Sequence, residues 1–431
     1  MNATPLSTTQ RRIYKKSGLI VRGLMRMIAN AKSIFLTLFQ TYFMQMTPER
    51  SIVTNTESSI PHEVSIVIPC LNEAETIATV ITKAKHALFT LGIDGEVVIA
   101  DNGSTDGSQA LAEQHGARVI DIPTRGYGAA LIGGIHAAHG TYIIMGDADD
   151  SYNFADIAPF IDALRAGKQL VMGTRMKGTI LPGAMPPLHR WIGNPVLTFI
   201  GNLFFRTHLS DYHCGLRAFD TNAIRSLDLR TSGMEFATEM VAKAAINHLS
   251  IAEVPITYHP DGRSRRPHLR TWRDGWRHLK FMLLLSPAWV FIQPGLLVTL
   301  FGLFGLGYGL SQRAGDTSFN STLAVPLLSL LAVILGAQIL IFGILARLYA
   351  NKNGVLRSTP FWERLADTLS IDTGLIIGGI SVVVGTIFII SALAQSSAPA
   401  LILGLLTVVL GIQVVFLSFV VSLIRIQDNF T

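Results

Sequence analysis

Cysteine is scarce in this chain, because only Cys70 and Cys214 occur among its 431 residues. The two lie far apart and lack the close spacing of metal-binding cysteines, which argues against a structural zinc site. Two cysteines are also too few for the disulfide framework of a small secreted domain. The sequence therefore indicates neither of these classes of protein.

Charged side chains are missing from three long stretches. Residues 281–312, 317–346 and 373–424 contain no Asp, Glu, Lys or Arg. A membrane-spanning helix needs about 20 apolar residues, so each stretch can cross a bilayer and the last can cross it twice. We therefore predict a transmembrane domain over residues 287–431 with four helices, near 287–311, 322–346, 374–394 and 400–424.

Basic residues exceed acidic ones, and the formal net charge is +6. Much of the excess lies in the first 50 residues and between Arg263 and Lys280, beside apolar segments. This placement favours membrane lipid over nucleic acid as the partner. Residues 1–60 are predicted to be a basic amphipathic segment on the membrane surface. The alternative is a poorly ordered leader, or a gene start placed too early with the true start at Met44 or Met46.

Residues 61–262 show a different pattern, in which short β-branched runs alternate with helical ones. Strands are expected at 64–69, 96–100, 118–122 and 141–145, with helices at 73–91 and 106–115. Such alternation predicts an α/β domain with a mostly parallel, twisted sheet. Ligands of these sheets bind beyond the carboxyl ends of the strands, where Asn72, Glu73 and the polar residues 101–106 and 147–150 are expected.

Two carboxylates, Asp147 and Asp149, directly follow an apolar strand. An Asp-x-Asp triplet alone is as often a solvated turn, but its position after a buried strand favours a site for a hard divalent cation. Mg²⁺ or Mn²⁺ bound there would neutralise the charge on a departing nucleoside diphosphate. The Gly126-Tyr127-Gly128 segment superficially suggests dinucleotide binding, but Leu131 stands where that motif needs its third glycine, which argues against hydride chemistry.

In several motifs the chain resembles family 2 glycosyltransferases of the dolichyl-phosphate mannose synthase and polyprenyl-phosphate glycosyltransferase group. The motifs that match are Ile66-Val67-Ile68-Pro69 with Asn72-Glu73, residues 101–108 and 126–131, Asp147-Ala148-Asp149, Gly173-Thr174-Arg175 and residues 211–217. The resemblance implies a GT-A nucleotide-diphospho-sugar transferase domain, dependence on Mg²⁺ or Mn²⁺, and inversion at the anomeric carbon.

The resemblance also implies roles for single residues. The nucleotide of the donor would be bound by Pro69, Asn72, Glu73, Asp101, Asn102, Ser104, Gly126 and Asp147. Asp147 and Asp149 would bind the diphosphate and the metal. The family commonly continues this triplet with Leu-Gln, whereas Asp150-Ser151 stands here, so Ser151 is the aligned third metal ligand and Asp150 is its rival.

A lipid phosphate is already an anion, so the acceptor site has to capture it, and the planar fork of arginine suits that task. By the resemblance, Arg175 and Arg190 bind the acceptor phosphate, and Arg263 and Arg265 belong to a basic loop that does so. For Arg265 and Arg266 the alternative is simple attraction to anionic headgroups.

The expected catalytic residues are Asp149, Arg175 and Asp211. Asp211 would orient the acceptor or act as base; the alternative is that it caps a helix or pairs with Arg217. Glu235 and Glu239, four residues apart on an expected helix, are further candidates to face the site.

Residues 263–286 mix tryptophans with cations before the first span, which predicts interfacial helices that hold the site against the bilayer. The loop between the second and third spans carries Arg347, Lys352, Arg357 and Arg364, whereas the other two loops carry Arg313 with Asp316, or no charge. By the positive-inside rule, this basic loop and the catalytic domain face the cytoplasm of a multi-pass protein of the cell inner membrane.

The sequence thus predicts an enzyme that transfers one hexose from a UDP- or GDP-sugar to a polyprenyl phosphate, for cell-envelope glycosylation. One alternative is a processive polysaccharide synthase, but its Gln-x-x-Arg-Trp motif is absent, since Pro187 precedes Arg190-Trp191 where the Gln would stand. The other is a non-catalytic membrane protein that binds sugar or translocates lipid. The sugar, the nucleobase, the lipid and the oligomeric state, including a homo-oligomer, stay open.

Overall fold

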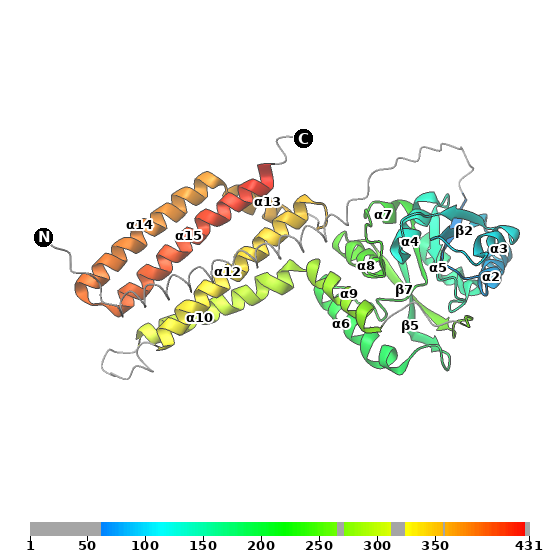
Figure 1. The fold of residues 1–431 in the computed structure, drawn as a ribbon, viewed down its shortest axis with the longest axis horizontal. Coiled ribbons are helices and arrows are strands. Elements are labelled where there is room, and N and C mark those ends of the chain that lie inside the picture. Colours follow the sequence, from blue (N-terminus) through cyan, green and yellow to red (C-terminus); the bar gives the residue numbers. More distant parts are fainter. Residues whose placement is uncertain (1–61, 265–270, 312–323, 357, 427–431) are drawn as a thin grey trace, which may run out of the picture. The chain divides into compact units, whose positions relative to one another are not determined.

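The computed structural model describes residues 62–264, 271–311, 324–356 and 358–426. Several features of the sequence interpretation lie outside these ranges: the segment 1–60, Arg265, Arg266, Arg313, Asp316 and Arg357. The described chain contains an α/β domain, a juxtamembrane helix and a set of long apolar helices (Figure 1).

A seven-stranded mixed sheet forms the centre of the α/β domain, in the order β3-β2-β1-β4-β6-β5-β7. The strands are β1 (Val64–Cys70), β2 (Gly95–Asp101), β3 (Arg118–Asp121), β4 (Tyr142–Met145), β5 (Leu170–Ile180), β6 (Arg217–Asp220) and β7 (Ile251–Tyr258). Strands β1 to β4 pair in parallel, while β6 runs antiparallel to both β4 and β5. The four strands expected from the sequence are confirmed to within two residues, and the sheet is mostly parallel as predicted.

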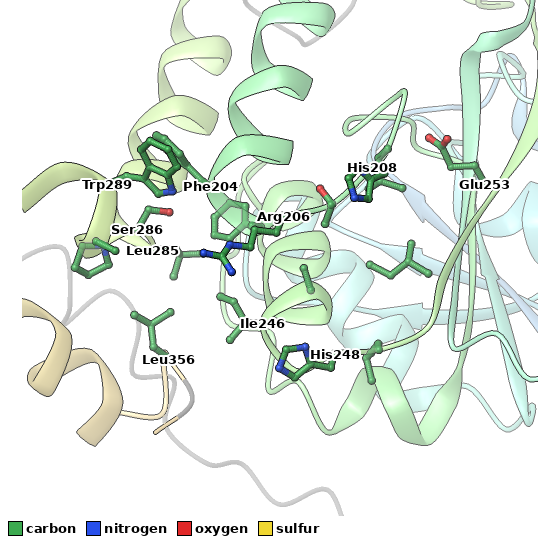
Figure 2. Close-up of a pocket in the computed structure, with 18 of the residues that line it drawn as sticks. Phe204, Arg206, His208, Ile246, His248, Glu253, Leu285, Ser286, Trp289 and Leu356 are labelled. Atoms are coloured by element: carbon green, nitrogen blue, oxygen red, sulfur yellow. The ribbon is translucent and has the colours of Figure 1, made fainter. Parts of the chain in front are cut away.

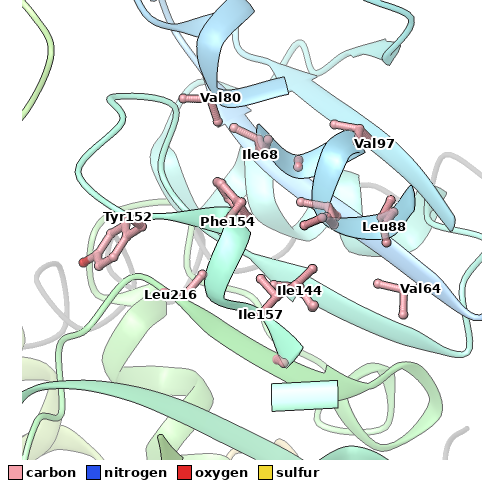
Figure 3. Packing of buried hydrophobic residues seen from close by; sticks show 14 of the residues in the cluster. Val64, Ile68, Val80, Leu88, Val97, Ile144, Tyr152, Phe154, Ile157 and Leu216 are labelled. Carbon is pink, nitrogen blue, oxygen red and sulfur yellow. The ribbon is translucent and has the colours of Figure 1, made fainter. Parts of the chain in front are cut away.

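Helices cover both faces of the sheet. Successive residues of the central strand point to opposite sides, so each face has its own core cluster. Ile66 and Ile68 of β1 pack in one cluster, whereas Val67 between them packs in the other. The helices of this domain are α2 (Ile77–Thr90), α3 (Ser108–Gln114), α4 (Tyr127–Ala137), η1 (Phe154–Asp156), α5 (Ala158–Arg165), η2 (His189–Gly193), α6 (Asn194–Phe205), α7 (Thr221–Arg225) and α8 (Phe236–Ile246). Figure 3 shows the first cluster, to which α2, η1 and α5 contribute.

Both expected helices are shorter in the structure, and the start of the first differs most. The helix expected at 73–91 begins at Ile77, because residues 73–76 form a turn in which the backbone N–H groups of Thr76 and Ile77 bond to the Glu73 carbonyl. This turn leaves the Glu73 side chain at the carboxyl end of β1, where the sheet presents its ligand-binding edge.

Four helices are long and apolar enough to cross a membrane, as the sequence predicts. They are Ala288–Ser311, formed by η3 (Ala288–Ile292) and α10 (Gln293–Ser311), then α12 (Ala324–Lys352), α14 (Ile371–Gln395) and Ala398–Arg425 within α15 (Ala398–Ile426). A short amphipathic helix, α13 (Pro360–Thr368), lies between α12 and α14. Figure 1 shows α10 beside α12 and α14 beside α15.

Glycines allow each of these helix pairs to pack closely. A Cβ added to Gly378 on α14 would lie 2.6 Å from the carbonyl oxygen of Gly411 on α15. Gly295 on α10 approaches Gly336 on α12 in the same way, at 3.0 Å. Small residues at such contacts let membrane helices pack backbone to backbone. The third and fourth spans therefore form a tight pair. The Gln413 side chain of α15 also donates a hydrogen bond of 3.0 Å to the Gln338 side chain of α12.

The juxtamembrane helix α9 (Thr271–Leu284) is amphipathic. Trp272 and Trp276 are exposed, whereas Phe281 and Met282 are buried, and Met282 packs in a core cluster of the α/β domain. Exposed tryptophans on a helix directly before a membrane span are typical of the headgroup region. The helix thus has the two faces that the sequence predicts for an interfacial element.

Candidate active site

The carboxylates of Asp147 and Asp149 follow β4 at the carboxyl edge of the sheet. Asp147 accepts a hydrogen bond of 2.9 Å from the Tyr127 hydroxyl. Burial, and secondarily the charge of Asp149, raises the pKa of Asp147 to about 7. Two carboxylates that share a buried site repel each other unless a cation lies between or beside them. This pair is therefore built to receive positive charge.

Arg263 supplies positive charge at this position. Its guanidinium donates to Asp149 Oδ2 at 2.5 Å and to Glu73 Oε1 at 3.0 Å, and it also contacts Asp261. The sequence analysis assigns Arg263 to the acceptor phosphate, but here it lies on the carboxylates expected to bind metal and nucleotide. A cation thus already stands at the predicted metal site.

The residues present fit a divalent cation. A carboxylate oxygen of Asp149 already contacts the Arg263 guanidinium, and nearby positive charge favours the ionised form of Asp147. Among the residues that the structure describes, no group of three or more His, Cys, Asp or Glu side chains is arranged to hold a metal. The protein would thus supply two carboxylates, and the remaining ligands would come from the donor diphosphate and water, as is usual for Mg²⁺.

The two rival third ligands have different partners. The Ser151 hydroxyl donates to Asp149 Oδ1 at 2.6 Å, and its backbone N–H donates to the same atom at 3.1 Å. Asp150 adopts a left-handed backbone conformation and pairs with Lys83 of α2 at 2.7 Å. Ser151 therefore orients Asp149, whereas the Asp150 carboxylate is engaged elsewhere.

Asp101, at the end of β2, is fully buried. Its Oδ2 accepts hydrogen bonds from the N–H groups of Gly103 and Ser104 and from the Gln109 side chain. Burial raises the pKa of Asp101, but the hydrogen bonds outweigh this effect and lower the pKa below its usual value. Its Oδ1 has no hydrogen-bond partner among the described residues. A buried carboxylate oxygen without a donor is costly, so this atom suits a donor group of a nucleobase or ribose.

The other predicted nucleotide residues shape the edge of the sheet. Asn72 accepts from the Thr105 N–H at 2.8 Å, while the Ser104 hydroxyl accepts from the Asn72 N–H at 2.8 Å. Asn102 uses its amide group to hold the chain after β3, donating to the Ile122 and Thr124 carbonyls. These side chains therefore fix two loops relative to each other, and Pro69 extends β1 beside β2.

Glycine is required at two positions of the site. Gly126 has a φ of 136°, and a Cβ there would lie 2.1 Å from the Ser232 carbonyl oxygen. A Cβ on Gly215 would lie 2.8 Å from Asp147 Oδ2. The segment 211–217 can thus approach the acidic pair. Sequence reasoning missed Tyr127 and Gly215 as parts of the site, although both stand inside motifs that it noted.

Asp211 and Arg175 form a buried, two-pronged ion pair. Arg175 Nε donates to Asp211 Oδ2 at 2.6 Å, and Nη2 donates to Oδ1 at 2.8 Å. Although burial opposes it, the Arg175 guanidinium holds the pKa of Asp211 below its usual value. Arg217, which the alternative interpretation pairs with Asp211, instead donates to the carbonyls of Cys214 and Ala237. Asp211 is therefore placed to orient Arg175, and Arg175 in turn stacks on the Tyr258 ring at 5.2 Å.

Arg190 lies on η2 and stacks on the Trp191 ring at 5.1 Å. Burial, and then the charge of the nearby Arg175, lower the pKa of its neighbour His189. The structure thus brings the segment that carries Arg190 to the neighbourhood of Arg175.

Glu239 serves the local fold. Its carboxylate accepts from the N–H groups of Arg230 and Thr231 and pairs with Lys243 at 2.8 Å. Glu235 lies at the start of α8, where its Oε2 is buried without a hydrogen-bond partner in the described part of the chain.

Comparisons with known proteins identify the family of the chain. The chain matches the family model "Glycosyl transferase family 2" over residues 65–228 and the model "Glycosyltransferase family 2 C-terminal transmembrane region" over residues 344–425. The low-salt glycan biosynthesis hexosyltransferase Agl6 of Haloferax volcanii is 35% identical, over 86% of this chain and 91% of that protein. A dolichyl-phosphate hexose transferase of the same organism is 29% identical, over 46% of this chain and 82% of that protein.

Among solved structures, glucosyl-3-phosphoglycerate synthase from Mycobacterium tuberculosis is 22% identical, over 52% of this chain and 79% of that one, with a TM-score of 0.43. The family matches and the mixed sheet confirm the expected GT-A domain and the four-helix membrane region. The chain is an enzyme that belongs to glycosyltransferase family 2 and carries the family's C-terminal transmembrane region.

Proposed function

We propose that this enzyme transfers a single hexose from a UDP- or GDP-linked donor to a polyprenyl phosphate, with inversion, at the cytoplasmic face of a membrane. The observation that carries the proposal is the position of the Asp147–Asp149 pair, which lies within electrostatic reach of both Arg263 and the Asp211-bound Arg175. One edge of the sheet thus combines groups for a metal diphosphate with a guanidinium for a second phosphate.

The donor half of the site is formed by β1, β2 and β4. The unpartnered Oδ1 of Asp101 supports binding of a nucleoside, and Asp147 and Asp149 would hold Mg²⁺ or Mn²⁺ against the diphosphate. When bound, such an ion neutralises the charge that develops on the leaving diphosphate. Ser151 keeps the Asp149 carboxylate oriented for this role.

The acceptor half rests on Arg175. In the inverting reaction, a phosphate oxygen of the acceptor forms a bond to the anomeric carbon while the bond from that carbon to the diphosphate breaks, and the diphosphate leaves with the electron pair. The attacking phosphate is already ionised, so no side chain has to remove a proton. Asp211 therefore acts by holding Arg175, whose guanidinium orients the acceptor phosphate.

The membrane helices support a lipid acceptor. The exposed Trp272 and Trp276 of α9 would sit among headgroups, which keeps the sheet edge near the surface where a polyprenyl phosphate presents its phosphate. The relatives, a hexosyltransferase of glycan biosynthesis and a dolichyl-phosphate hexose transferase, support transfer of a hexose and a lipid phosphate acceptor.

The proposal is tested with the purified full-length protein in detergent. Radiolabelled UDP- and GDP-hexoses are supplied with a polyprenyl phosphate and Mn²⁺ or EDTA, and label in the organic phase is counted. We expect transfer that needs the metal and that falls on the order of 100-fold or more in Asp149→Asn, because a carboxylate on the metal is lost.

Asp150→Asn is the matched control, since it removes the neighbouring carboxylate, which pairs with Lys83. It should change the rate by less than about fivefold, because a partly exposed ion pair contributes little. Equal loss in the two variants would reject the assignment of the metal ligands. Label found only in a sugar polymer, or no transfer to lipid from any donor, would reject the reaction.

A further inference from the structure

A cavity of about 850 Å³ lies apart from the acidic pair and Arg175. Its walls come from the end of α6, the turn between α8 and β7, and the turn between α9 and η3 (Figure 2). Phe204 of α6 stacks on Trp289 of η3 at 5.6 Å and closes one side. None of the sites expected from the sequence includes this cavity.

The cavity lies where two membrane spans end. Trp289 stands at the start of the span Ala288–Ser311, and Arg347, which also lines the cavity, stands near the end of the span Ala324–Lys352. Tryptophan and arginine at span ends are typical of the headgroup layer. The cavity is therefore at the depth at which lipid phosphates lie.

Arg206 directs a cation into this space. It follows α6 in the left-handed backbone region, with a φ of 54°, where glycine or asparagine is the usual residue. Figure 2 shows its guanidinium extending toward Leu285. No hydrogen bond or ion pair ties the Arg206 side chain to any residue that the structure describes. Arg206 is exposed, so all the donors of its guanidinium are open to an anion in the cavity.

Ser286 provides a second, independent observation. Its side chain is only 5% exposed, and its hydroxyl lacks a hydrogen-bond partner within the described ranges. The residue lines the cavity, and in Figure 2 its oxygen points into the space that the Arg206 side chain enters. A buried hydroxyl without a partner is unfavourable, so an acceptor atom in the cavity would stabilise it.

The cavity is separated from the catalytic arginine by a layer of satisfied polar groups. Glu253 lines the cavity and pairs with Lys177 at 2.7 Å. Its other oxygen accepts from the Ser210 N–H at 2.6 Å and from the Ser210 hydroxyl at 2.9 Å, next to Asp211. An occupant would thus contact the segment that holds Asp211 without reaching the acceptor phosphate of the proposed reaction.

We propose that this cavity binds the phosphate headgroup of an anionic membrane phospholipid, with Arg206 and Ser286 donating hydrogen bonds to the phosphate. Phe204 and Trp289 contact the apolar part of the lipid. The polyprenyl phosphate acceptor offers the same phosphate chemistry, but Glu253 and Ser210 lie between the cavity and Asp211 with its partner Arg175. The phospholipid would stabilise the junction between the α6 end and η3.

The test is native mass spectrometry of the delipidated full-length protein in detergent. Phosphatidylglycerol is compared with phosphatidylcholine of the same acyl chains and with a polyprenyl phosphate. We expect tight retention of phosphatidylglycerol, reduced about fivefold in affinity in Arg206→Gln, because one cation near lipid phosphate contributes about that factor. Ser286→Ala should weaken binding as well.

Arg364→Gln is the matched control, since Arg364 is an exposed cation on α13 that does not line the cavity. It should leave the affinity unchanged. The proposal is overturned if phosphatidylcholine binds as well as phosphatidylglycerol, if Arg206→Gln behaves like Arg364→Gln, or if only the polyprenyl phosphate competes for the site. The readout needs no sugar transfer, so a protein that binds phosphatidylglycerol but transfers no sugar would reject the proposed reaction alone.

Discussion

The Arg263 guanidinium occupies the position at which the sequence predicts a metal ion. Its guanidinium bonds to both Asp149 and Glu73, and these carboxylates in turn raise the pKa of Arg263 further. A divalent ion can bind Asp149 fully only if this contact is broken. The Arg263 side chain would therefore compete with a metal ion for Asp149 whenever no donor is bound.

Replacing Arg263 by Gln should strengthen binding of Mn²⁺ to the nucleotide-free enzyme. A charge-assisted contact of about 1 kcal/mol no longer has to be displaced, so the dissociation constant should fall about fivefold. Titration followed by electron paramagnetic resonance measures the free ion directly. Arg277→Gln, on the exposed part of α9, should have no effect; unchanged or weaker binding in Arg263→Gln would contradict the competition.

At the scale of elements, the attachment of α9 depends on two buried histidines. His278 of α9 is hydrogen-bonded to Thr238 of α8 at 2.8 Å and packs edge-on against the His213 ring. Burial lowers the pKa of His278 to about 4, with Asp274 opposing and Arg217 and Arg277 reinforcing the shift. Burial, His278, Arg217 and Arg175 likewise lower the pKa of His213. Both rings are therefore neutral in the folded protein.

Acidification should loosen α9. A histidine whose folded pKa is depressed stabilises the fold fully above its unfolded pKa of about 6.5, and this stability is lost as the pH falls toward the folded value. For His278 the loss at about pH 5.5 is on the order of 1 kcal/mol. After correction for the base-catalysed intrinsic exchange rate at each pH, the protection of residues 271–284 against hydrogen exchange should therefore be lower at about pH 5.5 than at about pH 7.5.

The control for this effect is His278→Gln, which keeps a hydrogen-bonding group but does not titrate. Its corrected protection over α9 should depend less on pH than that of the wild type, whereas His86→Gln, on the exposed face of α2, should behave like the wild type. An equally steep pH dependence in His278→Gln would exclude His278 as the cause.

For the whole molecule, the topology in the membrane can be measured because the native cysteines are inert. Cys70 and Cys214 are buried, and burial raises the pKa of these thiols to about 11 and about 12. An introduced exposed cysteine is then the reactive thiol of the described chain. Ser358, between α12 and α13, and Gln395, at the end of α14, are both exposed and lie at opposite ends of a span.

We expect Ser358→Cys to react with a membrane-impermeant maleimide only in inverted vesicles, and Gln395→Cys only in intact cells. The reason is the basic loop between α12 and α14, which the positive-inside rule places in the cytoplasm. Gel-shift labelling of the two variants measures this directly. The reverse pattern would place the α/β domain on the outer side.

Much of the fold follows from local sequence patterns. Strand β1 is recognisable because all its residues from Val64 to Cys70 are apolar or small and buried on both faces, as parallel strands are. The membrane spans are recognisable because they lack charge over the length of a bilayer. The start of α2 at Ile77 could not be predicted, because it depends on a turn that the Ser108 hydroxyl also stabilises through the Glu73 N–H.

The sheet, the four apolar helices and the acidic pair at the end of β4 can be predicted from the sequence, because they depend on hydrophobic period, on length and on the order of neighbouring residues. The partners of the charged groups depend on the tertiary structure. Arg175 and Asp211 are 36 positions apart, and Arg263 and Asp149 are 114 positions apart, yet each pair is in contact. A side chain can find such a partner only after the sheet has brought distant loops to one edge, so no local pattern records the contact.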